Sequence, residues 1–189
     1  MNKLLEVPFV LKIATKDWHP ADHISFAANH PGSQPYTSST TITNPLNPTE
    51  TYETRLWPIH CVQGTRGAEL VPELNVDKID RIVEKGQRKE VEMYSAFYDP
   101  LTDPRCSDSG LAEVLKEAGI QRVFVVGLAA DYCVKATALD SKKEGFETFI
   151  VEEGTKPVDE AMWETTSKEI EEAGVTIVRL DQGGFEIPI

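Results

Sequence analysis

Cys133 has the sequence context of a cysteine that could act as a nucleophile. An apolar run at residues 123–127 ends at a glycine, and Cys133 follows six residues later, at the expected start of a helix. Backbone N–H groups at a helix N-terminus lower the pKa of a thiol and can bind a developing oxyanion. Ligands of open α/β sheets bind at the carboxyl ends of the strands. The placement therefore predicts a reactive thiol, with a small buried core cysteine as the ordinary alternative.

Three further side chains could bind a metal ion. Asp17 and His19 are two residues apart on an expected extended segment, so their side chains point to the same face. His60, in a distant loop, would complete half of a coordination shell and leave positions for water or substrate. One carboxylate and two imidazoles suit zinc, iron or manganese. A surface histidine near a carboxylate is the more common explanation of an Asp-x-His pair.

The composition excludes several classes of protein. The 189 residues suffice for one domain with a sizeable core. The net charge of −12 argues against a surface for nucleic acid or anionic membranes, because both require positive charge. The sequence has neither an apolar run of about 18 residues nor a signal-peptide pattern. Its three cysteines show no paired spacing, which indicates a reducing compartment. We expect a cytoplasmic protein, with a nuclear or peroxisomal location as alternatives.

Strands and helices are expected to alternate along most of the chain. Apolar runs predict strands at residues 10–15, 79–83, 123–127, 149–151 and 175–180. Helices are expected at residues 111–118, with Ser109 as N-cap, from Cys133 to Gly145, and at residues 159–173. This alternation predicts an α/β fold with a parallel sheet covered by helices on both faces, in a single domain over residues 1–189.

Residues 27–55 differ from the rest of the chain. They are rich in Pro, Asn, Ser and Thr and show no apolar period. We therefore expect one long ordered loop inserted within the domain, and loops of this length are usually functional.

Several motifs occur in a fixed order that resembles a known family. They are TKDWHP (15–20), HISF (23–26), LWPIHCV (56–62), Lys85-Gly86, EMYSAF (92–97) and GLAADYCVKAT (127–137). Along nearly its whole length, the chain resembles the nicotinamidase branch of the isochorismatase-like hydrolases. The resemblance implies a three-layer α/β/α fold with a six-stranded parallel sheet. It also implies hydrolysis of nicotinamide to nicotinate and ammonia, in NAD salvage.

The resemblance implies a role for each residue around the nucleophile. Cys133 would attack the amide carbonyl and form a thioester, and the charge of Lys85 would favour the thiolate. The backbone N–H groups of Ala129 and Cys133 would form the oxyanion hole, beside a cis peptide at Leu128–Ala129. Without the family, Lys85 would be interpreted as a solvated lysine at a strand end.

The resemblance also implies a metal site that binds substrate. Its ligands would be Asp17, His19 and His60, and His23 is a further ligand in some relatives. The ion, zinc or alternatively iron or manganese, would hold the pyridine nitrogen of the substrate. Glu92 matches a family residue near the metal-bound waters. Trp57 and Tyr94 match aromatic walls of the substrate pocket, with core packing as the alternative for each.

One family motif is not found. Family members carry a first strand with a pattern like V-D-x-Q-x-D-F, whose aspartate acts as general base. Residues 1–9 contain no aspartate, so we expect this chain to lack the first strand and the catalytic aspartate. Two alternatives therefore stand beside nicotinamide hydrolysis. One is another amidase of the superfamily, and the other is an impaired paralogue that binds metal or nicotinamide without turnover. Assembly as a homo-oligomer is left open.

Overall fold

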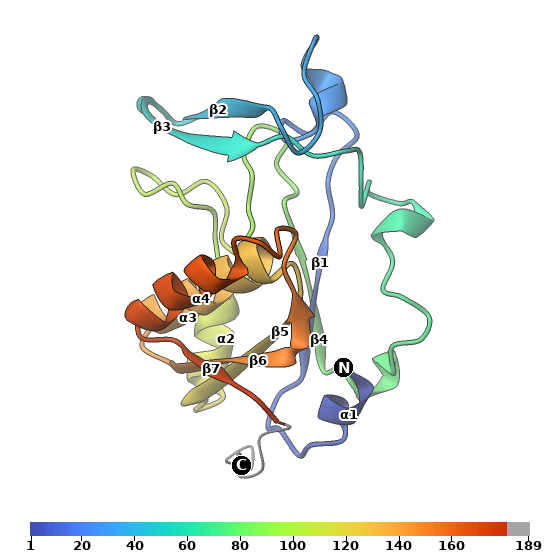
Figure 1. The fold of residues 1–189 in the computed structure, drawn as a ribbon, viewed down its shortest axis with the longest axis vertical. Coiled ribbons are helices and arrows are strands. Elements are labelled where there is room, and N and C mark those ends of the chain that lie inside the picture. Colours follow the sequence, from blue (N-terminus) through green and yellow to red (C-terminus); the bar gives the residue numbers. More distant parts are fainter. Residues whose placement is uncertain (181–189) are drawn as a thin grey trace. The chain divides into compact units, whose positions relative to one another are not determined.

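A computed structural model describes residues 1–180 of the chain (Figure 1). The chain divides into two compact units. The Cys133 unit comprises Met1–Lys12, Tyr94–Phe97 and Gly110–Ile189. The histidine unit comprises Ile13–Met93 and Tyr98–Ser109, and it holds all four histidines.

The Cys133 unit is built on a three-stranded parallel sheet of order β5-β6-β7. The strands are β5 (Arg122–Leu128), β6 (Glu147–Lys156) and β7 (Thr176–Val178). The helices of the unit are α1 (Asn2–Leu5), α2 (Leu111–Glu117), α3 (Lys135–Lys143) and α4 (Trp163–Glu172). The expected strand–helix alternation is confirmed here, although β6 is longer than residues 149–151 and β7 is shorter than residues 175–180.

Alternating side chains of this sheet are buried on its two faces. This is the period-two pattern of a sheet that is covered on both sides. One face packs against α3 and α4, which lie side by side in Figure 1, in a cluster that contains Val125, Ile150, Ala138 and Ile170. The other face packs against Leu4 of α1, in a cluster that contains Phe149, Val151, Val178, Phe124 and Val126.

Two helix starts differ from the predicted positions. Gly110, at φ +70°, is the N-cap of α2 and makes no side-chain cap hydrogen bond, so the prediction of Ser109 as N-cap was wrong. Helix α4 begins at Trp163 instead of residue 159. The carboxylate of Asp159 accepts hydrogen bonds from the N–H groups of Ala161 and Met162, at 3.1 and 3.3 Å. This local turn competes with helix formation over the predicted first residues.

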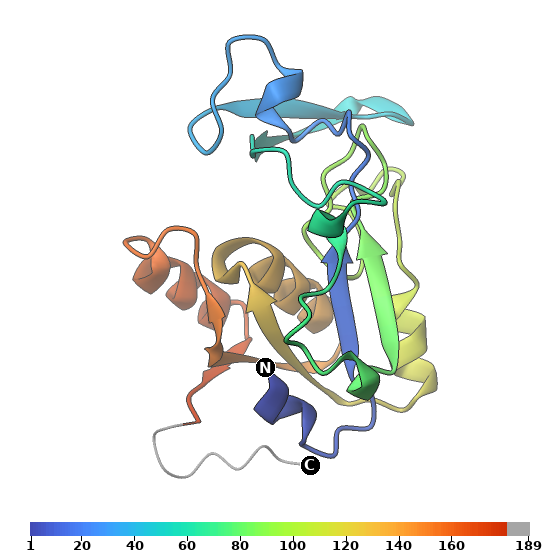
Figure 2. The ribbon, with the colours of Figure 1, turned by 90° about the vertical axis from the view of Figure 1, so that its right-hand side faces the viewer.

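The histidine unit contains a parallel pair of strands, β1 (Ile13–Asp17) and β4 (Arg81–Lys85). Figure 2 shows the two strands side by side. Both lie two to three residues later in the chain than the apolar runs predicted. Their register pairs the last residue of each strand, Asp17 with Lys85. Two charged side chains therefore lie next to each other at the carboxyl ends of the pair.

Part of the predicted loop at residues 27–55 is regular structure, so that prediction was wrong for its second half. Strands β2 (Ser39–Asn44) and β3 (Asn47–Arg55) form an antiparallel hairpin. Threonine, isoleucine and tyrosine favour strands, and Ile42 is fully buried opposite Tyr52. The turn is closed by Asn44, whose side-chain oxygen accepts the N–H of Leu46 at 2.9 Å. Short 3₁₀ helices occur at Ala27–Asn29, Arg66–Ala68 and Val76–Lys78.

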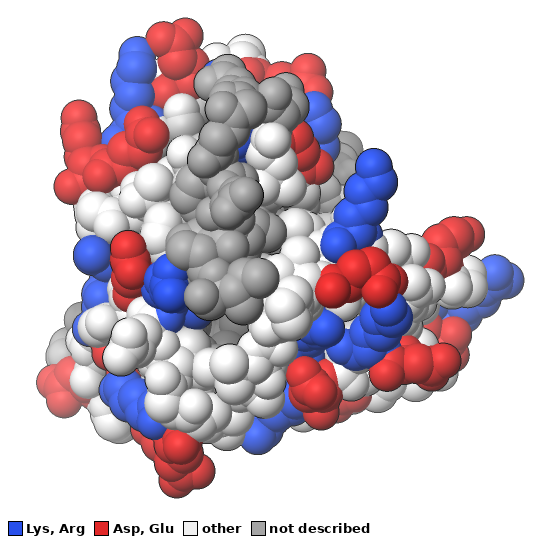
Figure 3. All heavy atoms as spheres, turned by 90° about the horizontal axis from the view of Figure 1, so that it is seen from below, with Lys and Arg blue, Asp and Glu red and all other residues white. Residues whose placement is uncertain are grey.

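The described surface in Figure 3 carries charges of both signs. Basic and acidic side chains are interspersed on the described part of the face in Figure 3. In the part of the chain that the structure describes, no helix is long and apolar enough to cross a membrane.

Candidate active site

The loop that carries His60 is held against the segment after β1 by backbone hydrogen bonds. The N–H of His19 donates to the carbonyl of Cys61 at 3.0 Å, and the N–H of Gln63 donates to the carbonyl of His19 at 2.8 Å. These bonds form a parallel bridge between His19 and Val62. Residues some forty positions apart in the sequence are thereby brought to the end of β1, where Asp17 is the last strand residue.

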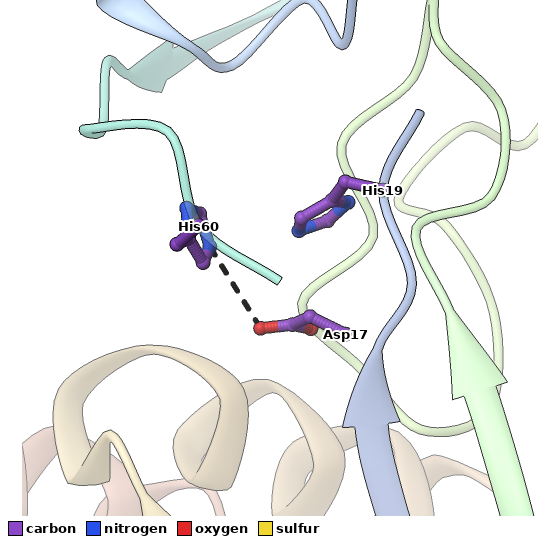
Figure 4. Close-up of side chains that lie close together, drawn as sticks. All are labelled: Asp17, His19 and His60. Atoms are coloured by element: carbon purple, nitrogen blue, oxygen red, sulfur yellow. Dashed lines mark ion pairs between the residues drawn. The ribbon is translucent and has the colours of Figure 1, made fainter. Parts of the chain in front are cut away.

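Asp17, His19 and His60 converge as the sequence predicted. One ligand atom from each side chain lies within 4.8 Å of the other two. The three side chains point toward one another in Figure 4, where the dashed line joins His60 Nε2 to Asp17 Oδ2 at 3.9 Å. Asp17 and His60 are part-buried, and His19 is buried.

The hydrogen bonds of the two imidazoles determine which nitrogen could bind a metal. His19 Nδ1 lies 2.8 Å from the carbonyl of Gly86, and His60 Nδ1 lies 2.9 Å from the carbonyl of Pro58. A carbonyl only accepts, so each Nδ1 carries the proton and each Nε2 keeps a lone pair. Carbonyl partners of this kind orient metal-binding histidines in proteins. Two Nε2 atoms and a carboxylate form a donor set that fits a divalent metal ion.

Gly86 is required by the close approach of His19. A Cβ atom at this position would lie 2.3 Å from Cε1 and 2.5 Å from Nδ1 of His19. The φ of Gly86 is +67°, in the left-handed region that favours glycine. The sequence placed Gly86 in a family motif, but its steric role could be recognised only from the structure.

Lys85 is 4% exposed, so its interpretation as a solvated lysine is wrong. Its Nζ donates to Asp17 Oδ1 at 2.5 Å and to the carbonyl of Met93 at 3.2 Å. Burial alone would raise the pKa of Asp17, but the positive charge of Lys85 and the effects of the neighbouring histidines bring this pKa below its ordinary value. Asp17 is therefore a carboxylate at neutral pH, as metal binding requires. The predicted effect of Lys85 on the Cys133 thiol stays a prediction.

His23 does not have the environment of a fourth ligand. Its Nδ1 accepts from the backbone N–H of Ser25 at 3.3 Å and lies 2.8 Å from the hydroxyl of the same residue. The proton is then on Nε2, which lies 3.2 Å from the carbonyl of Val91. Both ring nitrogens are thus engaged by protein groups, and burial lowers the pKa of His23 to about 4. The ring instead packs against His19, with 4.2 Å between the centroids.

The other predicted substrate-binding residues lie in both units. Glu92 is buried, and its Oε1 accepts the N–H of Met93 at 2.9 Å. Trp57 is part-buried and packs edge-on against Tyr36, whereas Tyr94, in the Cys133 unit, packs edge-on against Tyr132. Their roles in binding substrate stay predictions.

The turn that carries Cys133 follows β5 directly. The peptide bond between Leu128 and Ala129 is cis, at the predicted position. A π-helical turn, Ala130–Val134, comes next and leads into α3. It is closed by the N–H of Val134, which donates to the carbonyl of Ala129 at 3.0 Å. Cys133, whose thiol is part-buried and in no disulfide, lies in this turn, so the prediction that it opens an α-helix was wrong. Turns of this kind are frequent at functional sites.

Asp131 anchors this turn, a role that the sequence reasoning missed. Its Oδ1 accepts the N–H of Val158 at 2.9 Å, and its Oδ2 accepts the N–H of Asp159 at 3.0 Å. The segment after β6 is thereby tied to the turn two residues before Cys133. An aspartate between the strand-ending glycine and the cysteine was the available signal, because aspartate is often used to bind backbone N–H groups.

Comparisons with known proteins show which proteins this chain resembles. The isochorismatase domain family matches residues 32–182. The nicotinamidase of Acinetobacter baylyi is 43% identical over 147 residues, which cover 78% of this chain and 64% of that protein. The chain therefore spans slightly less than two thirds of the length of this relative. The nicotinamidase of Schizosaccharomyces pombe is 37% identical over 180 residues, covering 94% of this chain and 79% of that protein.

Solved structures give the same result. The yeast nicotinamidase bound to the inhibitor nicotinaldehyde matches with a TM-score of 0.82 at 32% identity, covering 90% of this chain and 80% of that chain. The pyrazinamidase of Pyrococcus horikoshii in complex with zinc matches with a TM-score of 0.65 at 34% identity, covering 89% and 75%. These likenesses confirm the predicted fold class, the three-layer α/β/α fold of isochorismatase-like hydrolases. Because the domain family matches most of the chain, the chain belongs to the isochorismatase family.

Proposed function

We propose that this protein hydrolyses nicotinamide to nicotinate and ammonia, as a step of NAD salvage. The observation that carries the proposal is the convergence of Asp17, His19 and His60, with both imidazole Nε2 atoms available to a metal. The similarity to curated nicotinamidases at 37–43% identity supports the same substrate.

In the proposed reaction, the thiolate of Cys133 attacks the amide carbonyl. The amide nitrogen takes up the proton that the thiol gave up and leaves as ammonia, which forms a thioester. Water then cleaves the thioester and releases nicotinate. The backbone N–H groups of Ala129 and Cys133 bind the oxyanion that develops on the carbonyl. In this proposal Lys85 favours the thiolate form, and Trp57 and Tyr94 flank the pyridine ring.

We propose zinc as the metal, with iron or manganese as alternatives. The pyrazinamidase complex with zinc supports this choice. When bound, the ion supplies a Lewis acid for the pyridine nitrogen of nicotinamide. Asp17, His19 and His60 hold the ion, and Glu92 is proposed to lie near its waters.

The test compares two amides that differ in one ring atom. Benzamide has the same carboxamide as nicotinamide but lacks the pyridine nitrogen. We expect ammonia release from nicotinamide to exceed that from benzamide by at least about tenfold, because orientation of the amide depends on the ring nitrogen. Removal of the metal with a chelator should abolish this preference, and added zinc should restore it. Equal rates on both amides would favour another amidase of the superfamily.

The same experiment separates the enzyme from a protein that binds without turnover. An impaired paralogue would bind nicotinaldehyde or nicotinamide, measured by calorimetry, and would release no ammonia.

We further propose that residues 1–189 form a single isochorismatase-like domain, supported by a family match that includes residues of both units. A cytoplasmic location and a homo-oligomeric state stay predictions.

A further inference from the structure

The side chain of Tyr52 contacts a short buried segment beside the metal-ligand residues. The Tyr52 hydroxyl donates to the carbonyl of Glu92 at 2.8 Å and accepts the N–H of the same residue at 3.0 Å. One hydroxyl thus binds both backbone groups of a single residue. Tyr52 belongs to strand β3 of the hairpin, in a region that the sequence predicted as a loop.

Residues 91–93, which we call the strap, hold two groups of the site through their carbonyls. The carbonyl of Met93 accepts from Lys85 Nζ, and the carbonyl of Val91 lies 3.2 Å from His23 Nε2. Each strap residue is at most 4% exposed. Because the strap is buried and short, the position of Glu92 determines where both carbonyls lie.

The two groups held by the strap are in contact with two metal-ligand residues. Lys85 Nζ lies 2.5 Å from Asp17 Oδ1, and the ring of His23 packs 4.2 Å from the ring of His19. A continuous set of contacts therefore runs from Tyr52 through the strap to Asp17 and His19. Outer groups of this kind orient metal ligands and affect affinity for the ion.

We propose that Tyr52 is a positioning residue that acts through the strap to orient Asp17 and His19 for metal binding. The inference deepens the proposed metal site and rests on it. Tyr52 itself touches neither metal nor substrate in this account. The hairpin is thereby part of the machinery that shapes the site.

The test measures zinc affinity, not activity. Zinc dissociation constants are determined by competition with a chromophoric chelator for the wild type, Tyr52→Phe and Thr51→Val. Phenylalanine keeps the ring and removes the hydroxyl. Thr51→Val removes a hydroxyl from the adjacent, exposed residue of the same strand and is the matched control. We expect Tyr52→Phe to weaken zinc binding by about 3- to 10-fold, below the effect of a direct ligand partner, and Thr51→Val to leave it unchanged.

A second arm tests the route by a double-mutant cycle. Lys85→Met removes the contact between the strap and Asp17, so Tyr52→Phe should weaken zinc binding less in that background than in the wild type. Unchanged affinity in Tyr52→Phe would overturn the inference, and so would equal losses in Tyr52→Phe and Thr51→Val, or an equal effect of Tyr52→Phe with and without Lys85. Absence of zinc binding by the wild type would instead overturn the proposed metal site.

Discussion

The Cys133 turn and the group around Asp17 are built in different ways. The turn consists of consecutive residues: β5 ends, the chain passes through the cis peptide at Leu128–Ala129, and a π turn carries the thiol. The group around Asp17 draws on separate segments, at residues 17–19, 60, 85–86 and 91–93. His19 and Asp17 are oriented there by partners far away in the sequence, Gly86 and Lys85.

This difference predicts how the two regions respond to change. The local backbone places Cys133 in the turn, so a substitution of the Cys133 side chain should remove the chemistry of the turn and leave its shape. The group around Asp17 depends on strand register and on the strap, so a change at one segment should disturb ligands on another. Zinc affinity and amide hydrolysis are therefore separable measurements.

Cys133→Ala should separate the two regions most clearly. If the thiol is the nucleophile, ammonia release should fall by about 10⁴-fold or more, because single nucleophile removals have effects of this size. Zinc content, measured by elemental analysis, should stay near one ion per chain, because no metal-ligand residue is changed. Loss of zinc from this variant would show that the two regions are not independent.

His19→Ala and His60→Ala should affect the metal. The purified wild type should carry about one transition-metal ion, and each variant should bind zinc at least roughly a hundredfold more weakly, since one of three protein ligands is lost. His30→Ala is the matched control, because His30 lies in the same unit and its Nε2 contacts the carbonyl of Ile24 outside the ligand set. Equal metal content in the wild type and both ligand variants would reject the assignment.

Gly86→Ala tests whether the site depends on a long-range fit. The new Cβ would overlap the His19 ring, so zinc affinity should fall by about tenfold, as for loss of an outer partner of a ligand. Gly32→Ala is the control: its φ is +82°, but a Cβ there meets nothing within 4 Å. Both variants should lose about 1–2 kcal/mol in urea unfolding from the left-handed backbone, and Gly86→Ala should lose more because its Cβ overlaps the His19 ring. Only Gly86→Ala should lose zinc affinity. A loss of zinc affinity in both variants would mean that backbone strain causes it, and not the overlap with His19.

The three thiols should differ in alkylation rate. Burial raises the pKa of Cys61 and of Cys106, with further contributions from Asp17 and Asp99 respectively. A raised pKa leaves less thiolate at a given pH, so labelling of these two thiols should shift to higher pH. We therefore expect iodoacetamide at neutral pH to label Cys133 several times faster, as mapped by mass spectrometry. Preferential labelling of Cys106 would identify Cys133 as an inert thiol.

Much of the candidate site could be predicted from sequence because its clues are local. The spacing of Asp17 and His19 on extended chain, and the position of Cys133 after an apolar strand, depend on neighbouring residues alone. The order of motifs then agreed with His60 as the third ligand and led to the cis peptide at Leu128–Ala129. These expectations are confirmed where the structure tests them, in the convergence of the ligand residues and in the cis bond.

Other features were decided only by tertiary contacts. The polar composition of residues 27–55 concealed the hairpin, because Ile42 and Tyr52 gain their partners only after folding. His23 could be a ligand by its position, but Ser25 and Val91 engage both of its ring nitrogens.

The sequence by itself determined the residue types, the strand–helix alternation of the Cys133 unit and the position of Cys133 just after β5, because these follow from short-range periodicity and backbone preference. The tertiary structure decided that Lys85 binds Asp17, that Gly86 makes room for His19, and that the strap is held from β3. Such pairings join residues tens of positions apart. They arise from register and packing, which no local pattern in the sequence specifies.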